Sequence, residues 1–380
     1  MNFDFTDEQE SFRQVIADFA KQEIAPNIAK WDQDHYFPVD AVRKLGDLGA
    51  FGVSFPEVYG GGGGDFTTLC LAIEELAKVD SSIAITLSAG VGLGANPIFK
   101  FGSDQQKMTW LPDLCAGKTL GAFGLTEPDG GSDAGATRSS YVFDDRRMGY
   151  VINGSKAYIT NSGTPITSII TVTARGEDGI SAFLVPSGTE GLTVEPPYRK
   201  LGWHSSDTHG LSLSDVFVEK ENLLGRAGRG FAQFLSILDD GRVAIAALAC
   251  GLISACLDIA VDHANNRNAF GGPISRFQGV SFMCSEIAIK LEVARTMVYR
   301  AAWLKDMERP FKKEAAVAKA YSSEAAIDAT RLALQVTGGA GFIEDSPIAR
   351  HYRDAKILEI GEGTSEIQRL VIARELGLRL

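Results

Sequence analysis

The stretch Arg353–Arg369, RDAKILEIGEGTSEIQR, lies near the C-terminal end of the chain and carries its most informative pattern. Glu362 stands between two glycines, directly before an apolar pattern with helical spacing. Ser365, with Gln368 three residues later, predicts an N-cap and a capping box for that helix. The glycines leave little side-chain bulk beside the carboxylate, so a ligand could approach it closely. A solvated loop glutamate would show the same Gly-Glu-Gly pattern, so these three residues alone do not decide a function.

Length, composition and charge limit the possible classes of protein. The 380 residues are 45% hydrophobic and 22% charged, and the formal net charge is −11. This predicts a globular chain of two or three domains, and the acidic charge argues against a nucleic-acid surface. The five cysteines are scattered and neither they nor the histidines show metal-ligand spacing, so we expect reduced thiols, a cytoplasmic location and no metal site. No signal sequence or membrane-spanning run is expected.

The pattern of elements changes twice along the chain and predicts three domains. Residues 1–119 read as helices and open with a capping box at Thr6–Gln9. Residues 120–228 hold short β-type runs, with a hairpin turn predicted at Asn153-Gly154. Residues 229–380 return to long helices with short connections, as in a four-helix bundle. We expect an α+β multidomain protein with a helical N-terminal domain, a middle β-barrel or sandwich, and a C-terminal bundle.

Two apolar segments predict long buried helices. Residues 81–101 are nearly uncharged and rich in glycine and alanine, which favours a single helix buried on all sides. The second helix is expected to begin at Asp239–Arg242, because acidic residues suit the positive end of the helix dipole. It continues as an apolar run to Val261. In the next helix, the helical spacing predicts one apolar face formed by Ile287, Leu291, Ala294, Val298 and Ala301.

Taken together, the motifs resemble those of the acyl-CoA dehydrogenase family. The stretch R-D-A-K…E-G-T…E-I-Q-R resembles the family's C-terminal signature, and Phe123–Asp133, FGLTEPDGGSD, resembles its flavin motif. The resemblance covers essentially the whole chain, with the motifs in the family's order. It implies an FAD-dependent flavoprotein that oxidises an acyl-CoA thioester to a trans-2-enoyl-CoA, as in fatty acid β-oxidation. It also implies that Glu362 removes the α-proton while flavin N5 takes the β-hydride.

The same resemblance assigns flavin contacts to the β-domain. Thr126 would bind the flavin ring, and Ser132 would lie by the pyrophosphate or the pantetheine arm of the substrate. Thr160 would bond near flavin N5 with Tyr158 packed behind the ring, although many family members carry tryptophan at this place. The implied cofactor residues of this group are Phe123, Leu125, Thr126, Gly131, Ser132, Tyr158, Ile159 and Thr160, joined by Thr364 and Glu366 beyond the base.

Two further motifs imply that a neighbouring subunit completes the cofactor site. They are R-N-A-F-G at 267–271, followed by Gln278, and Q-V-T-G-G at 335–339. A helix C-terminal turn would also explain the paired glycines. By resemblance the protein is a homotetramer, or at least a dimer, and passes electrons to an electron-transferring flavoprotein. The residues implied to reach the neighbour's FAD are Arg267, Phe270, Gln278, Gln335, Val336, Gly338 and Gly339.

The substrate side contains one position that discriminates within the family. Some members carry the catalytic glutamate where this chain has Gly241, which leaves Glu362 as the candidate base. Gly361 replaces the tyrosine usual before the base and removes a ring from that side of the pocket. The helix at 79–99, which by resemblance floors the acyl pocket, contains no lysine or arginine, which predicts that dicarboxylic acyl-CoAs are poor substrates. The implied substrate residues are Ser132, Asp239, Arg242 and Gly363.

The proposed base must differ from an ordinary glutamate. A carboxyl with a pKa of about 4.3 is a poor base for a thioester α-proton. Burial would raise the pKa of Glu362, whereas the nearby helix N-terminus would oppose that rise. Two alternatives remain: a flavin oxidase of the same fold that uses O2, and a non-catalytic member of the fold such as one that binds DNA. The known oxidases are usually longer or use aspartate, and the acidic charge disfavours DNA binding.

Overall fold

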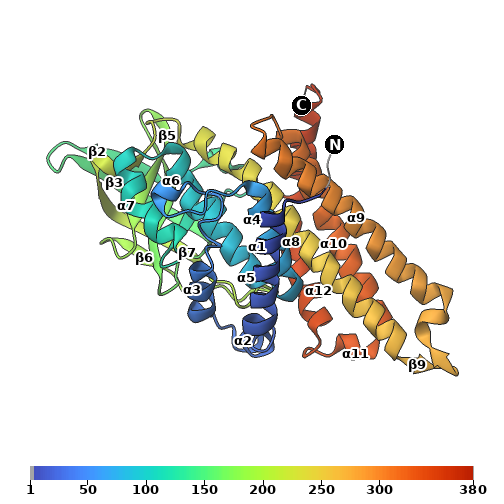
Figure 1. Ribbon diagram of the computed structural model, residues 1–380. Coiled ribbons are helices and arrows are strands. Elements are labelled where there is room, and N and C mark those ends of the chain that lie inside the picture. The colour runs from blue at the N-terminus through green and yellow to red at the C-terminus, as the bar shows by residue number, and fades with distance from the viewer. Residues whose placement is uncertain (1–3, 380) are drawn as a thin grey trace.

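The computed structural model describes residues 4–379 and shows helices at both ends of the chain with a β-sheet between them (Figure 1). The predicted capping box at Thr6 is confirmed, because the Thr6 hydroxyl accepts from the Gln9 N–H at 3.2 Å and the Gln9 side chain accepts from the Thr6 N–H at 2.9 Å. The N-terminal helices are α1 (Asp7–Phe19), α2 (Ile28–Asp34), α3 (Val39–Asp47), α4 (Phe66–Val79), α5 (Ser81–Ala89), α6 (Asn96–Phe101) and α7 (Asp104–Cys115).

The prediction of a single regular helix at 81–101 is wrong, because a π-helical turn at Gly90–Ala95 separates α5 from α6. This turn packs against the first strand, β1 (Leu120–Gly124). A Cβ atom added at Gly94 would lie 2.7 Å from the carbonyl oxygen of Gly121. Only glycine allows the two backbones to approach so closely, and this approach favours a local change of helical pitch.

The middle of the chain forms a mixed sheet of eight strands in the order β6-β7-β3-β2-β4-β5-β8, with β1 paired parallel to β4. Thirteen buried residues between its strands form a core separate from that of the helices. The strands after β1 are β2 (Ser140–Asp144), β3 (Gly149–Thr160), β4 (Thr167–Gly176), β5 (Gly179–Pro186), β6 (Leu192–Val194), β7 (Thr208–Glu219) and β8 (Leu223–Leu224).

The hairpin predicted at Asn153-Gly154 is wrong. Both residues lie inside β3, which pairs with β2 on one side and β7 on the other. The turn between β2 and β3 falls at 145–148 instead. Gly154 has φ +146°, and a Cβ atom there would lie 2.3 Å from the hydroxyl of Ser139. The glycine therefore serves a close approach at a β-bulge opposite β7 rather than a two-residue turn.

The C-terminal part is a bundle of long helices. The apolar face predicted for the helix after Val261 is confirmed, because Ile287, Leu291, Ala294, Val298 and Ala301 are all buried. The elements are α8 (Gly230–Asn266), α9 (Gln278–Asp306), α10 (Lys312–Thr337), α11 (Gly339–Phe342), α12 (Pro347–Leu358) and α13 (Ser365–Glu375), with a small ribbon of β9 (Asn268–Ala269) and β10 (Gly272–Pro273) between α8 and α9. The prediction that 239–242 begins this helix is wrong, because α8 begins at Gly230, about two and a half turns before Asp239.

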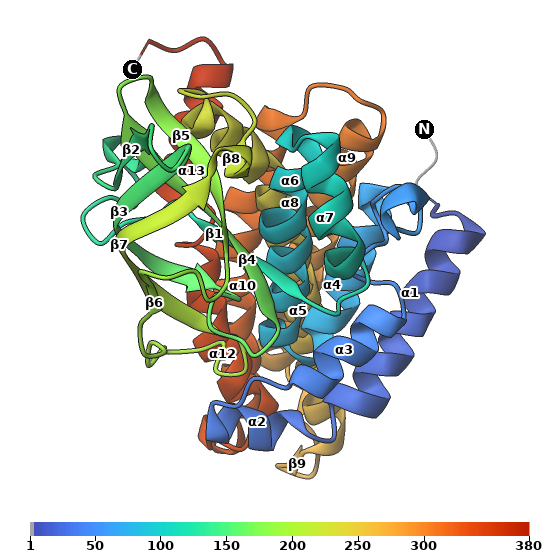
Figure 2. The same cartoon turned by 90° about the vertical axis from the view of Figure 1, so that its left-hand side faces the viewer.

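The helices of the two ends share one hydrophobic core, in which α4 and α5 pack directly on α8 (Figure 2). Against expectation, the segments Ser81–Phe101 and Gly230–Asn266 are long and apolar enough to cross a membrane, by length and composition. However, 78% and 83% of their apolar windows are buried inside the protein. Their hydrophobicity is therefore accounted for by their place in the centre of the core.

Candidate active site

Glu362 lies in the turn between α12 and α13, with φ +55°, and Gly363 follows with φ +89°. A left-handed backbone is uncommon for a residue with a side chain. The predicted N-cap at Ser365 is wrong: the cap is Thr364, whose hydroxyl accepts from the N–H of Ile367 at 3.3 Å. The helix therefore begins at Ser365, one residue earlier than it would if Ser365 were the cap.

Two side chains hold the backbone of this turn through its carbonyl groups. The Gln368 amide donates to the carbonyl oxygens of Gly363, at 2.8 Å, and Glu362, at 3.2 Å, so it does not complete the predicted capping box. Lys319 on α10 also donates to the Gly363 carbonyl, at 2.7 Å. Lys319 was not predicted from the sequence. The one feature that could have indicated it is a lysine among alanines in an amphipathic helix.

The carboxyl group of Glu362 is enclosed although the residue as a whole keeps partial exposure. Its Oε2 atom is buried without a hydrogen-bond partner among residues 4–379. Burial raises the pKa of Glu362 to about 7, while the charges of Arg242 and Lys319 act to lower it. A carboxylate with a pKa near neutral pH is a better base than an ordinary glutamate and is still partly ionised there.

Gly241 on α8 faces the carboxyl group of Glu362 directly. A Cβ atom added at Gly241 would lie 2.6 Å from Oε2 of Glu362. The next residue, Arg242, is buried and pairs with Asp239 on the same helix. The fold therefore brings together four positions singled out in the sequence from two separate segments of chain, namely Asp239, Gly241, Arg242 and Glu362.

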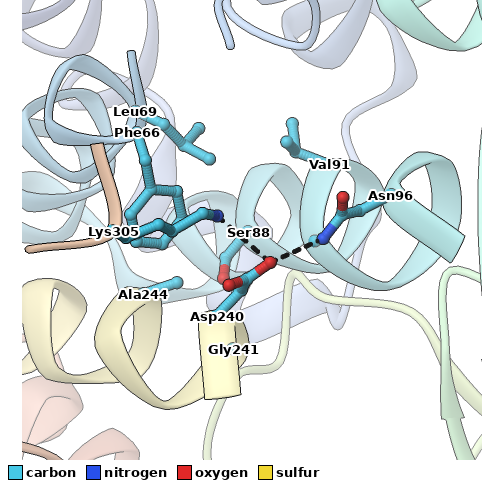
Figure 3. Close-up of a pocket in the computed structure, with 10 residues that line it drawn as sticks. Phe66, Leu69, Ser88, Val91, Asn96, Asp240, Gly241, Ala244 and Lys305 are labelled. Atoms are coloured by element: carbon cyan, nitrogen blue, oxygen red, sulfur yellow. Dashed lines mark hydrogen bonds and ion pairs between the residues drawn. The ribbon is translucent and has the colours of Figure 1, made fainter. Parts of the chain in front are cut away.

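A cavity of about 20 Å³ lies beside Gly241 between α4, α5, α8 and α9. Figure 3 shows Asp240 at one side of it, between Asn96 and Lys305. The Oδ2 atom of Asp240 lies 2.9 Å from the Asn96 amide nitrogen, 2.7 Å from Nζ of Lys100 and 3.1 Å from Nζ of Lys305. The segment 79–99 has no lysine, but Lys305 of α9 reaches this cavity. Its ammonium group is already paired with Asp240.

The flavin motif after β1 is stabilised by a buried ion pair. Glu127 accepts from Nζ of Lys156 at 2.7 Å, from the N–H of Arg138 at 2.6 Å and from the N–H of Ser139 at 3.1 Å. These bonds fix the turn that follows Thr126 and tie it to β3. Neither Glu127 nor Lys156 was among the predicted site residues, because a charged pair distant in sequence leaves no local pattern.

The surface formed by the end of β3 and the turn after β1 carries hydroxyl groups without partners. Among residues 4–379, no hydrogen bond is made by the side-chain hydroxyls of Thr126, Ser132 or Thr160. Tyr158 has φ +60° and is 66% exposed, and its ring centroid lies 5.2 Å from that of Tyr198. Free hydroxyls and an exposed aromatic ring suit a flat polar ligand, so this surface fits a flavin.

The other predicted cofactor residues differ in accessibility. Phe123 and Leu125 are buried, and Phe123 stacks on Phe234 at 4.0 Å, so these side chains belong to the core. Ile159 is likewise buried, whereas Gly131 is exposed with open space around its Cα atom.

The residues implied to reach a neighbouring subunit lie at one end of the bundle, where Figure 1 shows β9 and α11. Phe270 is 89% exposed, and the turn Gly338-Gly339 has open space around both Cα atoms. Val336 differs from the rest because it is buried. Arg267, Gln278 and Gln335 are exposed, and so is Glu366 beside the base.

Models of three domains match the chain in order. The N-terminal, middle and C-terminal domains of acyl-CoA dehydrogenase match residues 6–118, 122–216 and 228–377. The chain belongs to the acyl-CoA dehydrogenase family. This membership confirms the predicted family and its three-domain fold, and it confirms the class of enzyme, an FAD-dependent acyl-CoA dehydrogenase.

Individual relatives span the whole acyl-CoA dehydrogenase chain. A probable acyl-CoA dehydrogenase, YngJ, of Bacillus subtilis strain 168 is 49% identical over 380 residues, which is 99% of this chain and 100% of the relative. The structure of butyryl-CoA dehydrogenase from Megasphaera elsdenii superposes with a TM-score of 0.97 at 41% identity and covers 100% of both chains. A chain in the structure of the electron transferring flavoprotein of Acidaminococcus fermentans gives a TM-score of 0.96 at 40% identity, covering 99% of each chain.

Proposed function

We propose that this acyl-CoA dehydrogenase acts on short-chain acyl-CoA thioesters and that Glu362 removes the substrate α-proton. The observation that carries the proposal is the enclosed Glu362 carboxyl group with a pKa of about 7, set against Gly241 and the small cavity beside it. An ionisable group with this pKa, enclosed in the site, is what proton transfer near neutral pH requires.

The chain supplies the groups for proton removal. Among residues 4–379, no hydrogen-bond donor occupies the Oε2 atom of Glu362, so this atom is available to accept the substrate proton. In the same residues the backbone N–H of Glu362 has no acceptor, which leaves it free to donate to the thioester oxygen and stabilise developing enolate charge. Bound FAD supplies the hydride acceptor for the β-carbon. Arg242 and Lys319 support the ionised form of Glu362.

The cofactor would be held from two sides. Thr126, Ser132, Tyr158 and Thr160 would contact FAD from the β-domain, since their hydroxyl groups are free. The exposed residues around Phe270 and Gly338 would contact the FAD of a neighbouring subunit in a homotetramer. The likeness to a chain in the electron transferring flavoprotein structure of Acidaminococcus fermentans supports an electron-transferring flavoprotein as acceptor. A cytoplasmic location belongs to the same proposal and accords with five free cysteines.

The short chain length is supported by the size and border of the cavity. A volume of about 20 Å³ holds little more than one water-sized group. Beyond it lies the ion cluster of Asp240, Lys100 and Lys305, and an alkyl chain could extend further only by disturbing these buried charges. A second carboxylate on the substrate would lie close to the carboxylate of Asp240. Lys100 and Lys305 are already paired with Asp240, so dicarboxylic acyl-CoAs should be poor substrates.

The experiment is anaerobic titration of the purified FAD enzyme with butyryl-, hexanoyl-, palmitoyl-, isovaleryl- and glutaryl-CoA, followed by flavin absorbance. We expect bleaching by butyryl-CoA, little by palmitoyl-CoA and none by glutaryl-CoA. A flavin bleached by none of them would contradict the proposal, and robust glutaryl-CoA turnover would contradict its account of the cavity. Rapid O2 consumption during turnover would indicate an oxidase, and absence of bound flavin a non-catalytic binding protein.

A further inference from the structure

We propose that Lys319 is a positioning residue for the base, holding the Glu362 turn through the Gly363 carbonyl and placing a positive charge behind the carboxylate. The inference deepens the proposed function and rests on Glu362 as the base. Among residues 4–379, the side chain of Lys319 bonds to this turn only at the backbone carbonyl of Gly363, so Lys319 takes no proton from the substrate itself.

The geometry requires something to hold this turn. Glu362 and Gly363 are consecutive left-handed residues, with φ +55° and +89°. Such a backbone persists at a residue with a side chain only where its surroundings fix it. Here two donors converge on one oxygen, since Nε2 of Gln368 and Nζ of Lys319 lie 2.8 and 2.7 Å from the Gly363 carbonyl. They come from α13 and α10, on two sides of the turn.

The two donors differ in charge. Lys319 is fully buried and forms no ion pair among residues 4–379. Burial lowers the pKa of Lys319 to about 8, so it is largely charged at neutral pH. The charged groups that face it are Glu362, Arg242, Glu359 and Glu366, and Glu362 is the strongest of them. Facing Glu362 itself are Arg242 from α8 and Lys319 from α10.

Lys319 and Gln368 therefore share one role, and Lys319 has a second role of its own. Both hold the carbonyl of Gly363, and only Lys319 also favours the ionised form of the base. Loss of Gln368 should loosen the turn at every pH. Loss of Lys319 should loosen the turn and also shift the pH at which Glu362 ionises upward, because a nearby opposite charge stabilises a carboxylate.

The test is the rate of anaerobic flavin reduction by butyryl-CoA as a function of pH, in the FAD-loaded enzyme and three variants. For the unchanged enzyme we expect the rate to fall as the pH drops through about 7. In Lys319→Met this acid limb should move up by about one pH unit, so the loss is several-fold larger at pH 7 than at pH 9. In Gln368→Leu the rate should fall equally across the range with the limb unmoved. Lys319→Arg, which keeps the charge, should leave the limb near that of the unchanged enzyme.

An acid limb that stays in place in Lys319→Met, or moves equally in Gln368→Leu, would overturn the proposal. If Lys319→Met does not fold with FAD, Lys319→Gln replaces it, with the same upward shift expected. Failure of the base assignment is separate, because it would show as flavin reduction retained by Glu362→Gln. A crystal structure of Lys319→Met gives an independent readout, in which we expect the φ of Glu362 to leave the left-handed region or the turn to lose order.

Discussion

The turn that carries Glu362 and the β-domain surface that carries Tyr158 are built in contrasting ways. Both place a residue with a side chain in the left-handed region, at φ +55° and +60°. Around Glu362 the carboxyl group is enclosed and the neighbouring carbonyls are bound by Lys319 and Gln368. Tyr158 as a residue is 66% exposed, and its backbone lies within β3, at a register shift between β3 and β7.

The contrast separates chemistry from binding. The base side is complete within one chain, and its buried groups act on each other's pKa. The flavin side leaves the hydroxyls of Thr126, Ser132 and Thr160 without protein partners, as expected of a surface that a ligand completes. Substitutions near Glu362 should therefore change reaction rates, and substitutions near Thr160 should change cofactor affinity.

The largest expected effect is that of Glu362→Gln. Glutamine has almost the same shape but cannot accept the α-proton, so flavin reduction should fall by roughly 10²–10⁴-fold. Anaerobic stopped-flow absorbance measures this rate, with FAD content and acyl-CoA binding as controls that should stay near those of the unchanged enzyme. Substantial flavin reduction by the variant would contradict the contrast drawn above, because the turn that carries Glu362 would then not supply the base.

A smaller effect is expected for Gly241→Ala. The new methyl group would lie 2.6 Å from Oε2 of Glu362, so the carboxyl group must move away from its position. A displacement of this size should lower kcat/KM by about 10–100-fold. The matched control is Gly62→Ala, where the added Cβ meets its nearest atoms at an ordinary 3.6 Å. Equal kcat/KM values for the two variants would show that the position of Glu362 tolerates crowding.

The smallest effect is expected for Thr160→Ala on the flavin surface. Loss of one hydrogen bond to FAD should weaken cofactor affinity by about 1 kcal/mol, or several-fold in Kd. The free energy of unfolding of the FAD-free protein should not change, because the hydroxyl has no protein partner. Thr189→Ala is the opposite case, since its hydroxyl donates to the Pro186 carbonyl at 2.7 Å and its loss should reduce stability alone. Fluorescence titration with FAD measures the cofactor affinity, and urea unfolding measures the free energy of unfolding. A loss of stability in Thr160→Ala would contradict the view that this hydroxyl serves the cofactor alone.

Local patterns predicted much of the fold but failed where distant segments meet. The helical face of α9 and the capping box at Thr6 follow from spacing alone and are confirmed. The hairpin at Asn153-Gly154 failed because β3 continues through both residues with β2 and β7 on its two sides, and Ser139 packs against Gly154. The cap at Ser365 failed because the hydroxyl of the preceding residue, Thr364, accepts the capping bond, so the helix begins one residue earlier.

By itself, the sequence determined the order of helices, sheet and helices, and it singled out Glu362 through a motif contiguous along the chain. Only the tertiary structure decided the environment of that carboxyl group. Its pKa of about 7 depends on burial and on Arg242 and Lys319, which come from two other helices. Desolvation and charge act through space, so no local pattern around Glu362 could contain them.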